Sequence, residues 1–388
     1  MTVVLAVVPG MFNAAAIVID ERGTILGHAE SPSPGSRHDP RDPEMLWRSV
    51  VDAGCRAVSE AGRPTLDAVG VSSRGETVLA WDRSTGASRS PVLSRGDRRP
   101  VEDGIRAQID QLTRITGLEL DSSLGAPKMA WLRRRATDHD VVTTADTWVV
   151  HRLCGAFVTD ATTAARTLLL DVRRVGWSID AAAIFGLDVA QLPRIVECAH
   201  VVGTTDAFGR ETPVVGLAVD RHAALFGAGL LDPGAARAGD LDGSYFVAVA
   251  GPHVPRAHGG LDVGVAWQLT DPSGMRLNAT YLLCARATDV RDTRPESTTE
   301  LLRRADEQLG RPIRRLRVDG PEWALSRALE QLRRTTPELR IEVDGSSVTL
   351  AAHGIAALAR IGLDSSIAPA QAVKPPAPIA IFGAQAGA

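Results

Sequence analysis

Apolar residues follow two spacings along the chain, one typical of buried strands and the other of amphipathic helices. Nearly unbroken apolar runs at residues 3–8 and 14–20 predict two strands joined by a turn. A third antiparallel strand is expected over residues 24–29, after a short polar turn. Over residues 46–58, apolar side chains recur three and four positions apart, which predicts a helix with one buried face. The chain therefore begins with an apolar hairpin, an added strand and a covering helix.

The same alternation of strands and helices begins again after residue 234. The runs GSYFVAVAG and VGVAWQL predict strands, TTELLRRADEQLG predicts a helix, and IRRLRVDG predicts a further strand. The Pro- and Ala-rich tail lacks a periodic pattern, so we expect it to be disordered. The whole pattern predicts an α/β fold with two domains, residues 1–232 and residues 233–363. The second domain is unusually small, and the tail covers residues 364–388.

Composition narrows the class of protein without naming a function. The 388 residues carry a net charge of −3, so the chain lacks the basic footprint of a nucleic-acid-binding protein. No apolar run reaches the length of a membrane span. The four cysteines lie far apart and form no metal-binding or redox spacing. We therefore expect reduced thiols, no metal-ligating cluster and a cytoplasmic location.

A set of motifs in a fixed order carries a more specific signal. The segments ETVLAWDRSTG, SPVLSRGDRR, ADTWVVHRL, VTDATTAARTLLLDVR, AVDRHAALFGAGLLDPG and RVDG follow one another along the chain. In order and spacing they resemble the FGGY carbohydrate kinases, the glycerol kinase and xylulokinase family, over most of the first domain and in patches beyond it. The resemblance implies two domains of the actin-like, ribonuclease-H-like fold with a cleft between them. It also implies ATP and Mg²⁺ in that cleft and a sugar or polyol hydroxyl that attacks the γ-phosphate.

The resemblance places the general base of the family on Asp220. In the family this acid takes the proton of the attacking hydroxyl, while positioning and charge stabilisation supply most of the catalysis. The residues themselves agree with such a location, because an acid that ends an apolar strand projects at the carboxyl edge of a sheet, where α/β proteins bind ligands. Taken without the resemblance, Asp220 is also explained as the cap of the helix that follows.

On the substrate side, the family pattern is partly kept. The Arg-Glu pair of relatives becomes Gly75-Glu76, so the carboxylate stays and the guanidinium is lost. Arg74 lies next to this pair and is a candidate to replace the missing cation. Asp97 is kept in the SRGDRR segment, while the aromatic residue that contacts substrate in glycerol kinases falls on Ser123.

The residue after the general base also differs. Relatives have Gln there, and this chain has Arg221, which we expect to form an ion pair with Asp220, lower its pKa and make it a poorer base. His222 is interpreted as a residue of the helix N-terminus. Lys128 falls where many relatives also have a lysine, and we expect it to be a solvated helix residue.

The nucleotide side departs further from the family. The first phosphate loop has Val8 in place of the metal-organising acid and has lost its hydroxyls, while Gly10 keeps the bend. The second loop, Thr-x-Gly-Thr-Gly in relatives, reads GDLDG and ends in Gly243 and Ser244, and the adenosine motif reads DGPE around Gly320. The resemblance thus assigns the nucleotide to Gly10, Gly243, Ser244 and Gly320. Because preorganised polar groups are missing from both loops, binding of ATP and Mg²⁺ is expected to be impaired or lost.

Three functions stay open from the sequence. The first is a working kinase with an altered metal geometry, in which Asp240 and Asp242 act as ligands. The second is a pseudokinase that binds a sugar or polyol through Glu76, Asp97 and Asp220 and regulates another protein. The third is a structural partner of an active kinase paralogue that binds no small molecule. A homo-oligomer is compatible with each of them, and neither a nucleic acid nor a membrane is expected as a partner.

Overall fold

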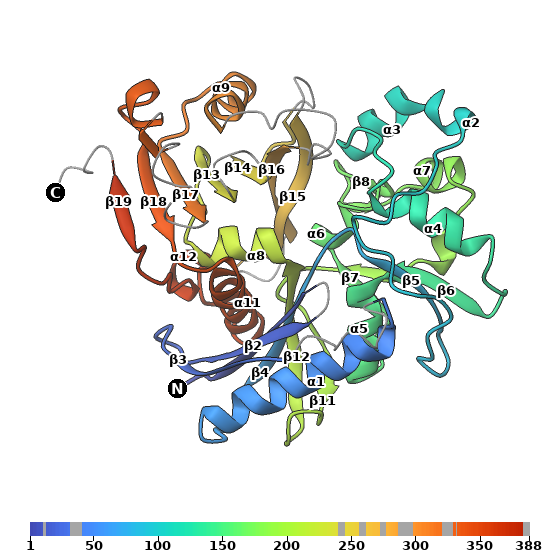
Figure 1. The fold of residues 1–388 in the computed structure, drawn as a ribbon, viewed down its shortest axis with the longest axis horizontal. Coiled ribbons are helices and arrows are strands. Elements are labelled where there is room, and N and C mark those ends of the chain that lie inside the picture. The colour runs from blue at the N-terminus through green and yellow to red at the C-terminus, as the bar shows by residue number, and fades with distance from the viewer. Residues whose placement is uncertain are drawn as a thin grey trace.

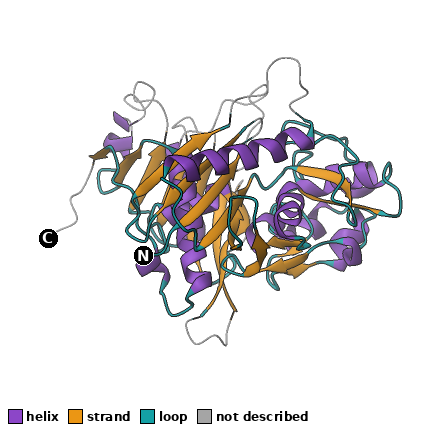
Figure 2. Ribbon diagram, turned by 90° about the horizontal axis from the view of Figure 1, so that it is seen from below, coloured by secondary structure: helices purple, strands orange, loops and turns teal. Residues whose placement is uncertain are grey.

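Two large β-sheets, with helices between and around them, form the framework of the molecule (Figures 1 and 2). The structure is a computed structural model. The part of the chain that it describes comprises residues 1–10, 13–31, 41–239, 245–255, 261–271, 277–285, 298–319, 329–330 and 332–382. The first sheet takes its strands from residues 4–219 and the second from residues 235–382. The predicted α/β class is confirmed, and the domain limits drawn from the sequence stay a prediction.

The first sheet has three parallel strands in its centre and antiparallel strands at both edges. Its strands, in spatial order, are β11 (Val201–Thr205), β12 (Thr212–Val219), β4 (Ala68–Ser73), β1 (Val4–Pro9), β2 (Ala14–Ile19) and β3 (Ile25–Glu30). β1, β4 and β12 run parallel, whereas β2, β3 and β11 each run antiparallel to a neighbour. β1 is buried along its whole length because Leu5 and Val7 enter one core while Ala6 and Val8 enter another. Its unbroken apolar run therefore reflects a strand covered on both faces.

The second sheet has the same mixture of directions. Its strands, in spatial order, are β15 (Leu261–Thr270), β16 (Leu277–Ala285), β14 (Tyr245–Gly251), β13 (Ala235–Gly239), β17 (Arg315–Asp319), β18 (Arg340–Asp344) and β19 (Ala380–Phe382). β13, β17 and β18 run parallel, and the strands outside them are antiparallel. Gly239 pairs with Asp319, and Asp319 pairs with Asp344, so these three parallel strands end level with one another.

Two helices, α8 (Asp220–Gly227) and α11 (Ser347–Leu363), lie between the two sheets (Figure 1). Their inner residues form one apolar core with residues of both sheets. The helices approach so closely that a Cβ atom on Gly354 would lie 1.8 Å from the Ala223 carbonyl oxygen. A Cβ atom on Gly227 would lie 2.1 Å from the Leu350 carbonyl oxygen. Glycine at both positions therefore lets the helix pair fill the space between the sheets.

Two further helices cover the outer faces of the sheets. α1 (Pro43–Glu60) packs on the opposite face of the first sheet from α11, and α9 (Thr298–Leu309) packs against the second sheet. The other described helices are α2 (Asp103–Arg106), α3 (Ile109–Thr116), α4 (Gly125–Arg133), α5 (Ala145–Cys154), α6 (Ala161–Ala164), α7 (Ile179–Ile184) and α12 (Pro369–Ala372). Short strand pairs join β5 (Val78–Asp82) to β6 (Asp140–Thr144), β7 (Val158–Asp160) to β10 (Arg194–Val196) and β8 (Leu170–Asp171) to β9 (Gly176–Trp177). None of the helices described is long and apolar enough to cross a lipid bilayer.

The segment after Asp364 differs from the disordered tail expected from its composition. It contains α12, and β19 pairs with β18 in antiparallel register, with Phe382 opposite Ile341. Val373 and Ala372 are buried in the core between the sheets. A strand added by backbone hydrogen bonds leaves little trace in composition, which explains why the Pro/Ala content was misleading.

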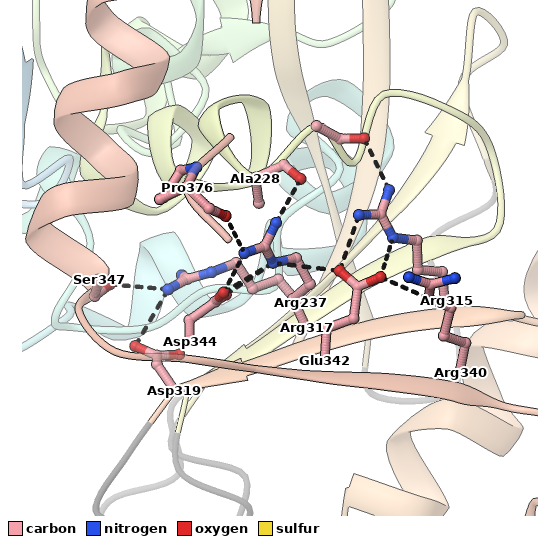
Figure 3. Close-up of polar contacts among 11 residues, drawn as sticks. Ala228, Arg237, Arg315, Arg317, Asp319, Arg340, Glu342, Asp344, Ser347 and Pro376 are labelled. Carbon is pink, nitrogen blue, oxygen red and sulfur yellow. Dashed lines mark hydrogen bonds and ion pairs between the residues drawn. The ribbon is translucent and has the colours of Figure 1, made fainter. Parts of the chain in front are cut away.

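A row of buried charges also holds this segment in place (Figure 3). Arg317 is 1% exposed and pairs with Asp344. Its Nη1 donates to the carbonyl oxygen of Ala228 at 3.0 Å, and its Nη2 donates to that of Pro376 at 3.2 Å. Glu342, 2% exposed, accepts from Arg315 at 2.9 Å and from Arg340 at 2.7 Å. The guanidinium of Arg317 therefore connects the end of α8 and the tail to the second sheet.

Candidate functional site

Asp220 lies where β12 ends and α8 begins, the location that the apolar run before it predicts, while its role as a general base stays a prediction. Its Oδ1 accepts a hydrogen bond from the backbone N–H of Arg221 at 2.7 Å, and its side chain is partly exposed. The residue before it is held by α6, because the Val219 N–H donates to Thr162 Oγ1 at 2.8 Å. The predicted ion pair between Arg221 and Asp220 is wrong, since the guanidinium of Arg221 turns to another carboxylate.

That carboxylate belongs to Glu76, and two arginines bind it. Arg166 Nε and Nη2 donate to Glu76 Oε1 at 3.0 and 2.8 Å, and Arg221 Nη2 donates to the same oxygen at 3.0 Å. The Glu76 side chain is 2% exposed. Burial alone would raise its pKa, but Arg221 and Arg166 outweigh burial and hold the pKa of Glu76 well below its ordinary value. Glu76 is therefore an ionised carboxylate whose charge is neutralised inside the protein. We call Glu76, Arg166 and Arg221 together the Glu76 clamp.

Arg74 does not take the place of the cation that relatives have beside this glutamate. Its side chain is exposed, and no hydrogen bond or ion pair joins it to Glu76 or to any other residue in the described ranges. Between them, Gly75 adopts a φ of +64°, a left-handed conformation that glycine tolerates, and this turn separates the two side chains. The cations at Glu76 come instead from α8 and from the segment after α6.

Lys128 is buried, contrary to the expectation of a solvated helix residue. Its side chain is 0% exposed, and Nζ donates to the backbone carbonyls of Glu76, Ser94 at 2.9 Å and Ser123 at 2.7 Å. Burial lowers the pKa of Lys128 to about 8, against the opposing effects of Glu76 and Asp97. One ammonium thus connects the three loops that carry the substrate-side residues.

Asp97 and Ser123 belong to these loops. Asp97 Oδ2 accepts hydrogen bonds from Ser94 N at 2.9 Å and Ser94 Oγ at 3.1 Å, so this carboxylate stabilises its own turn. Ser123, at the position of the substrate-contacting aromatic, is 5% exposed, and its N–H donates to Asp121 Oδ1 at 2.7 Å. The turn formed by Asp97 and the loop of Ser123 are both bonded to Lys128 through backbone carbonyls.

Arg95, for which the sequence shows no motif of its own, follows Ser94, whose backbone carbonyl shares the Lys128 ammonium with the backbone carbonyl of Glu76. Its side chain is half-buried, and no hydrogen bond or ion pair joins it to another described residue. Burial lowers the pKa of Arg95 to about 10; Glu76 opposes this effect, while Arg221 and Arg166 add to it. His222, the third residue of α8, is 3% exposed, and burial with the same two arginines lowers its pKa to about 3. Both side chains therefore experience the positive charge of the clamp.

The first nucleotide position lies at the end of β1. Val8 is 6% exposed and packs in the core between the sheets, so a hydrocarbon side chain stands where relatives have a metal-organising acid. Gly10 keeps a bend, in which its N–H donates to the Asn13 carbonyl at 2.7 Å. Within the described ranges, no group of three or more His, Cys, Asp or Glu side chains is placed to hold a metal ion.

The second nucleotide position lies where β13 and β17 end and β14 begins. The ring of Tyr245 lies against Gly239 so closely that a Cβ atom there would be 1.7 Å from Tyr245 Cε1. The Tyr245 hydroxyl donates to Asp319 Oδ1 at 2.7 Å and also contacts Arg237 Nη1. Arg237, 0% exposed, pairs with Asp319 Oδ2 at 3.2 Å and donates to Ser347 Oγ at 3.2 Å (Figure 3). We call this group the Arg237 network.

Several sequence assignments lie outside the described residues. They are Gly243, Ser244 and Gly320 of the nucleotide positions, and Asp240 and Asp242 of the altered metal geometry. The structure therefore describes the strands that lead into the second phosphate loop and the adenosine motif, and the residues named above lie outside it.

Residues 3–227 match the N-terminal domain of the FGGY family of carbohydrate kinases. The chain is 34% identical over 262 residues to a glycerol kinase of Aromatoleum aromaticum, which covers 61% of this chain and 52% of that protein. It is 32% identical over 308 residues to a glycerol kinase of Rhizobium rhizogenes, which covers 73% of this chain and 61% of that protein. The aligned part thus spans only about half to three-fifths of the length of these relatives.

Solved structures show the same fold at lower sequence identity. A Plasmodium falciparum glycerol kinase with ADP superposes with a TM-score of 0.82 at 17% identity, over 99% of this chain and 94% of that one. A xylulose kinase from Rhodospirillum rubrum gives a TM-score of 0.78 at 16% identity, over 99% of this chain and 94% of that one. The two-domain actin-like, ribonuclease-H-like fold expected from the sequence is therefore confirmed.

Proposed function

Because the chain belongs to the FGGY family of carbohydrate kinases, we propose that it binds a small polyhydroxylated molecule near Glu76 and Asp220 but does not phosphorylate that molecule with Mg-ATP. In this proposal the protein is a pseudokinase of the glycerol kinase-like branch. It uses the first domain to sense a sugar or polyol, and the bound state is read by another protein.

One observation carries the proposal: the ring of Tyr245 fills the space beside Gly239. The family resemblance places the first hydroxyl of the second phosphate loop at residue 239. A side chain there would collide with the ring, so this end of β13 offers no room for the threonine that holds phosphate in relatives. The hydroxyl of Tyr245 and the charge of Arg237 are both directed to Asp319, inside the protein. Polar groups that satisfy one another are not preorganised for a phosphate.

The metal position supports the same conclusion. ATP and Mg²⁺ are the cofactors of the family, and Mg²⁺ requires oxygen ligands in near-octahedral geometry. Val8 supplies no oxygen and is packed in an apolar core, so a water-filled metal site at this point would disturb the contact between β1 and the helix pair. The residues described therefore do not fit Mg-ATP held in the way of the relatives. Losing one preorganised group costs about 10²–10³ in rate, and here the metal acid and a phosphate-binding hydroxyl are both replaced.

A working kinase is the second candidate, because Asp220 keeps the location of a general base. It lies at the carboxyl end of β12, is partly exposed and forms no ion pair with Arg221. A base in this position is useful only if a γ-phosphoryl group is presented to the hydroxyl that it deprotonates. We favour the pseudokinase because the described nucleotide positions are filled by Val8 and Tyr245.

Calorimetric titration with a non-hydrolysable ATP analogue and Mg²⁺ tests the proposal. We expect no heat of binding up to millimolar analogue, whereas an active glycerol kinase run in parallel gives a saturable isotherm. A ligand at a hundredfold above its Kd stabilises a protein by about 2.7 kcal/mol, so a thermal-shift series provides an independent readout. Saturable, Mg²⁺-dependent binding in both measurements would overturn the proposal.

A further inference from the structure

On the basis of the proposed function, we infer that the ligand of the Glu76 region is an anionic polyol or sugar, whose carboxylate or phosphate group is bound by Arg95 and Arg221. The family resemblance points to polyols and sugars without specifying their charge, and the side chains of this chain point to an anionic one. The hydroxyl groups of such a ligand would face Asp220, on the same turn as Arg221.

The first observation is an excess of guanidinium groups around one carboxylate. Arg166 and Arg221 both donate to Glu76 Oε1, and Arg166 is the more buried, with 7% of its side chain exposed against 19% for Arg221. Arg166 alone donates to Glu76 through two nitrogens, Nε and Nη2, and both hydrogen bonds end on Oε1. Arg221 therefore shares a carboxylate that is already neutralised, and its charge is available to a second anion.

The second observation is that none of the described residues forms an ion pair with Arg95. Burying a charge without a partner is costly, so a half-buried guanidinium normally has a carboxylate beside it. Arg95 has neither an ion pair nor a hydrogen bond in the part of the chain that the structure describes, although Arg166 and Arg221 both repel it. A ligand anion between Arg95 and Arg221 would supply the missing negative charge.

Nearby carboxylates do not fill this role, because each has another partner. Asp121 accepts from Ser123 N at 2.7 Å and lies 3.9 Å from Arg98. Asp97 accepts two hydrogen bonds from Ser94. Among the residues that the structure describes, no carboxylate therefore pairs with Arg95.

A carboxylate or phosphate fits this arrangement better than a hydroxyl. The planar fork of arginine gives paired, charge-assisted hydrogen bonds to either anion, whereas a hydroxyl accepts a hydrogen bond without neutralising the charge. Gln, which relatives have at the position of Arg221, suits a neutral polyol. The exchange of Gln for Arg beside an unpaired Arg95 thus changes both the charge and the geometry offered to a ligand.

Titration calorimetry with three matched three-carbon compounds tests the inference: glycerol, glycerate and glycerol 3-phosphate. Their five-carbon counterparts xylitol, xylonate and xylitol 5-phosphate extend the series, and acetate and inorganic phosphate serve as anions without a polyol. We expect at least one anionic polyol to bind about tenfold or more tightly than its neutral counterpart, as expected for a charge-assisted hydrogen bond. The carboxylate and phosphate arms decide which anion is bound.

Arg95→Gln and Arg221→Gln are the informative variants, each expected to weaken the anionic ligand by about ten- to a hundredfold. Arg221→Gln also restores the residue of relatives and should bring neutral and anionic ligands closer in affinity. Arg48→Gln, which removes the same charge from an exposed position on α1, is the matched control and should leave the affinity unchanged. Thermal melting of each variant verifies that it is folded, and either arginine variant alone is sufficient for the test.

Equal or tighter binding of the neutral compounds would overturn the inference. It would also be overturned if no compound binds, if only acetate or inorganic phosphate binds, or if neither arginine variant changes the affinity. All titrations are done without ATP and Mg²⁺, so they do not depend on kinase activity. ATP-dependent phosphorylation would refute the proposed function while leaving the charge of the ligand to be decided by these titrations.

Discussion

Replacing Glu76 by Gln removes the one negative charge of the Glu76 clamp while keeping its size and one acceptor oxygen. The carboxylate is 2% exposed and the Arg166 side chain is 7% exposed. Water therefore cannot solvate the guanidinium of Arg166 once the carboxylate is removed. Removing one partner of a buried ion pair costs about 3–5 kcal/mol. Because the amide oxygen still accepts a hydrogen bond from Arg166, we expect the lower end, about 3 kcal/mol.

Urea unfolding followed by tryptophan fluorescence measures this cost. Trp81 and Trp148 are fully buried in the core beneath the first sheet, so their emission reports the unfolding of this part of the molecule. Arg221→Gln is the matched variant: Arg166 still neutralises Glu76 and Arg221 is partly exposed, so the cost should be about 1 kcal/mol.

The pH dependence gives a second readout with a defined sign. The folded-state pKa of Glu76 lies below its ordinary value of 4.5, so its stabilising contribution is present above that pH and is lost as the pH falls toward the folded-state pKa. The difference in stability between wild type and Glu76→Gln should therefore shrink in acid. A cost below about 1 kcal/mol at neutral pH, or a difference that grows in acid, would refute the clamp as described.

Three further substitutions test other buried charges. Arg317→Leu should cost about 3–5 kcal/mol in urea unfolding because it leaves Asp344 unpaired, and adding Asp344→Leu should recover most of the loss. Asp146→Asn should stabilise the fold at neutral pH by up to about 3 kcal/mol. Burial, with a contribution from Asp160, raises the pKa of Asp146 from 3.8 to about 6. The contribution of Asp146 to the free energy of unfolding is therefore full below pH 3.8 and is lost as the pH rises through 6. The stability gained by Asp146→Asn should accordingly vanish in acid. Lys128→Met should lower the unfolding free energy by about 2–3 kcal/mol, since three carbonyls lose their donor.

Much of the framework was predictable because hydrophobic periodicity records which faces are buried. The apolar runs of β1 and β2 and the helical spacing of α1 gave strands and a helix close to the observed limits. The position of Asp220 followed in the same way, because β12 is apolar up to the residue before it. Local patterns therefore located the elements and the end of the strand that carries the general-base position.

The partners of the charged residues were not predictable, because they are far apart in the chain. Arg166 lies 90 residues from Glu76, and Arg221 lies 145 residues from it, so no local pattern connects them. Lys128 was misassigned for a related reason: a buried lysine differs from an exposed one only through the carbonyls that it meets in the folded state. The same holds for Arg237 and Asp319, which are joined only when β13 and β17 pair.

Phosphoryl transfer itself is the measurement that tests the central claim most directly. The full chain is incubated with Mg²⁺, ATP labelled in its γ-phosphate, and a panel of neutral and anionic polyols and sugars. Transfer of the labelled phosphate to each acceptor is measured, and the Asp220→Ala variant gives the background. We predict no transfer above the Asp220→Ala background for any acceptor. Mg²⁺-dependent phosphorylation of one acceptor that Asp220→Ala abolishes would contradict the account, because the nucleotide positions at Val8 and Tyr245 would then have to support catalysis.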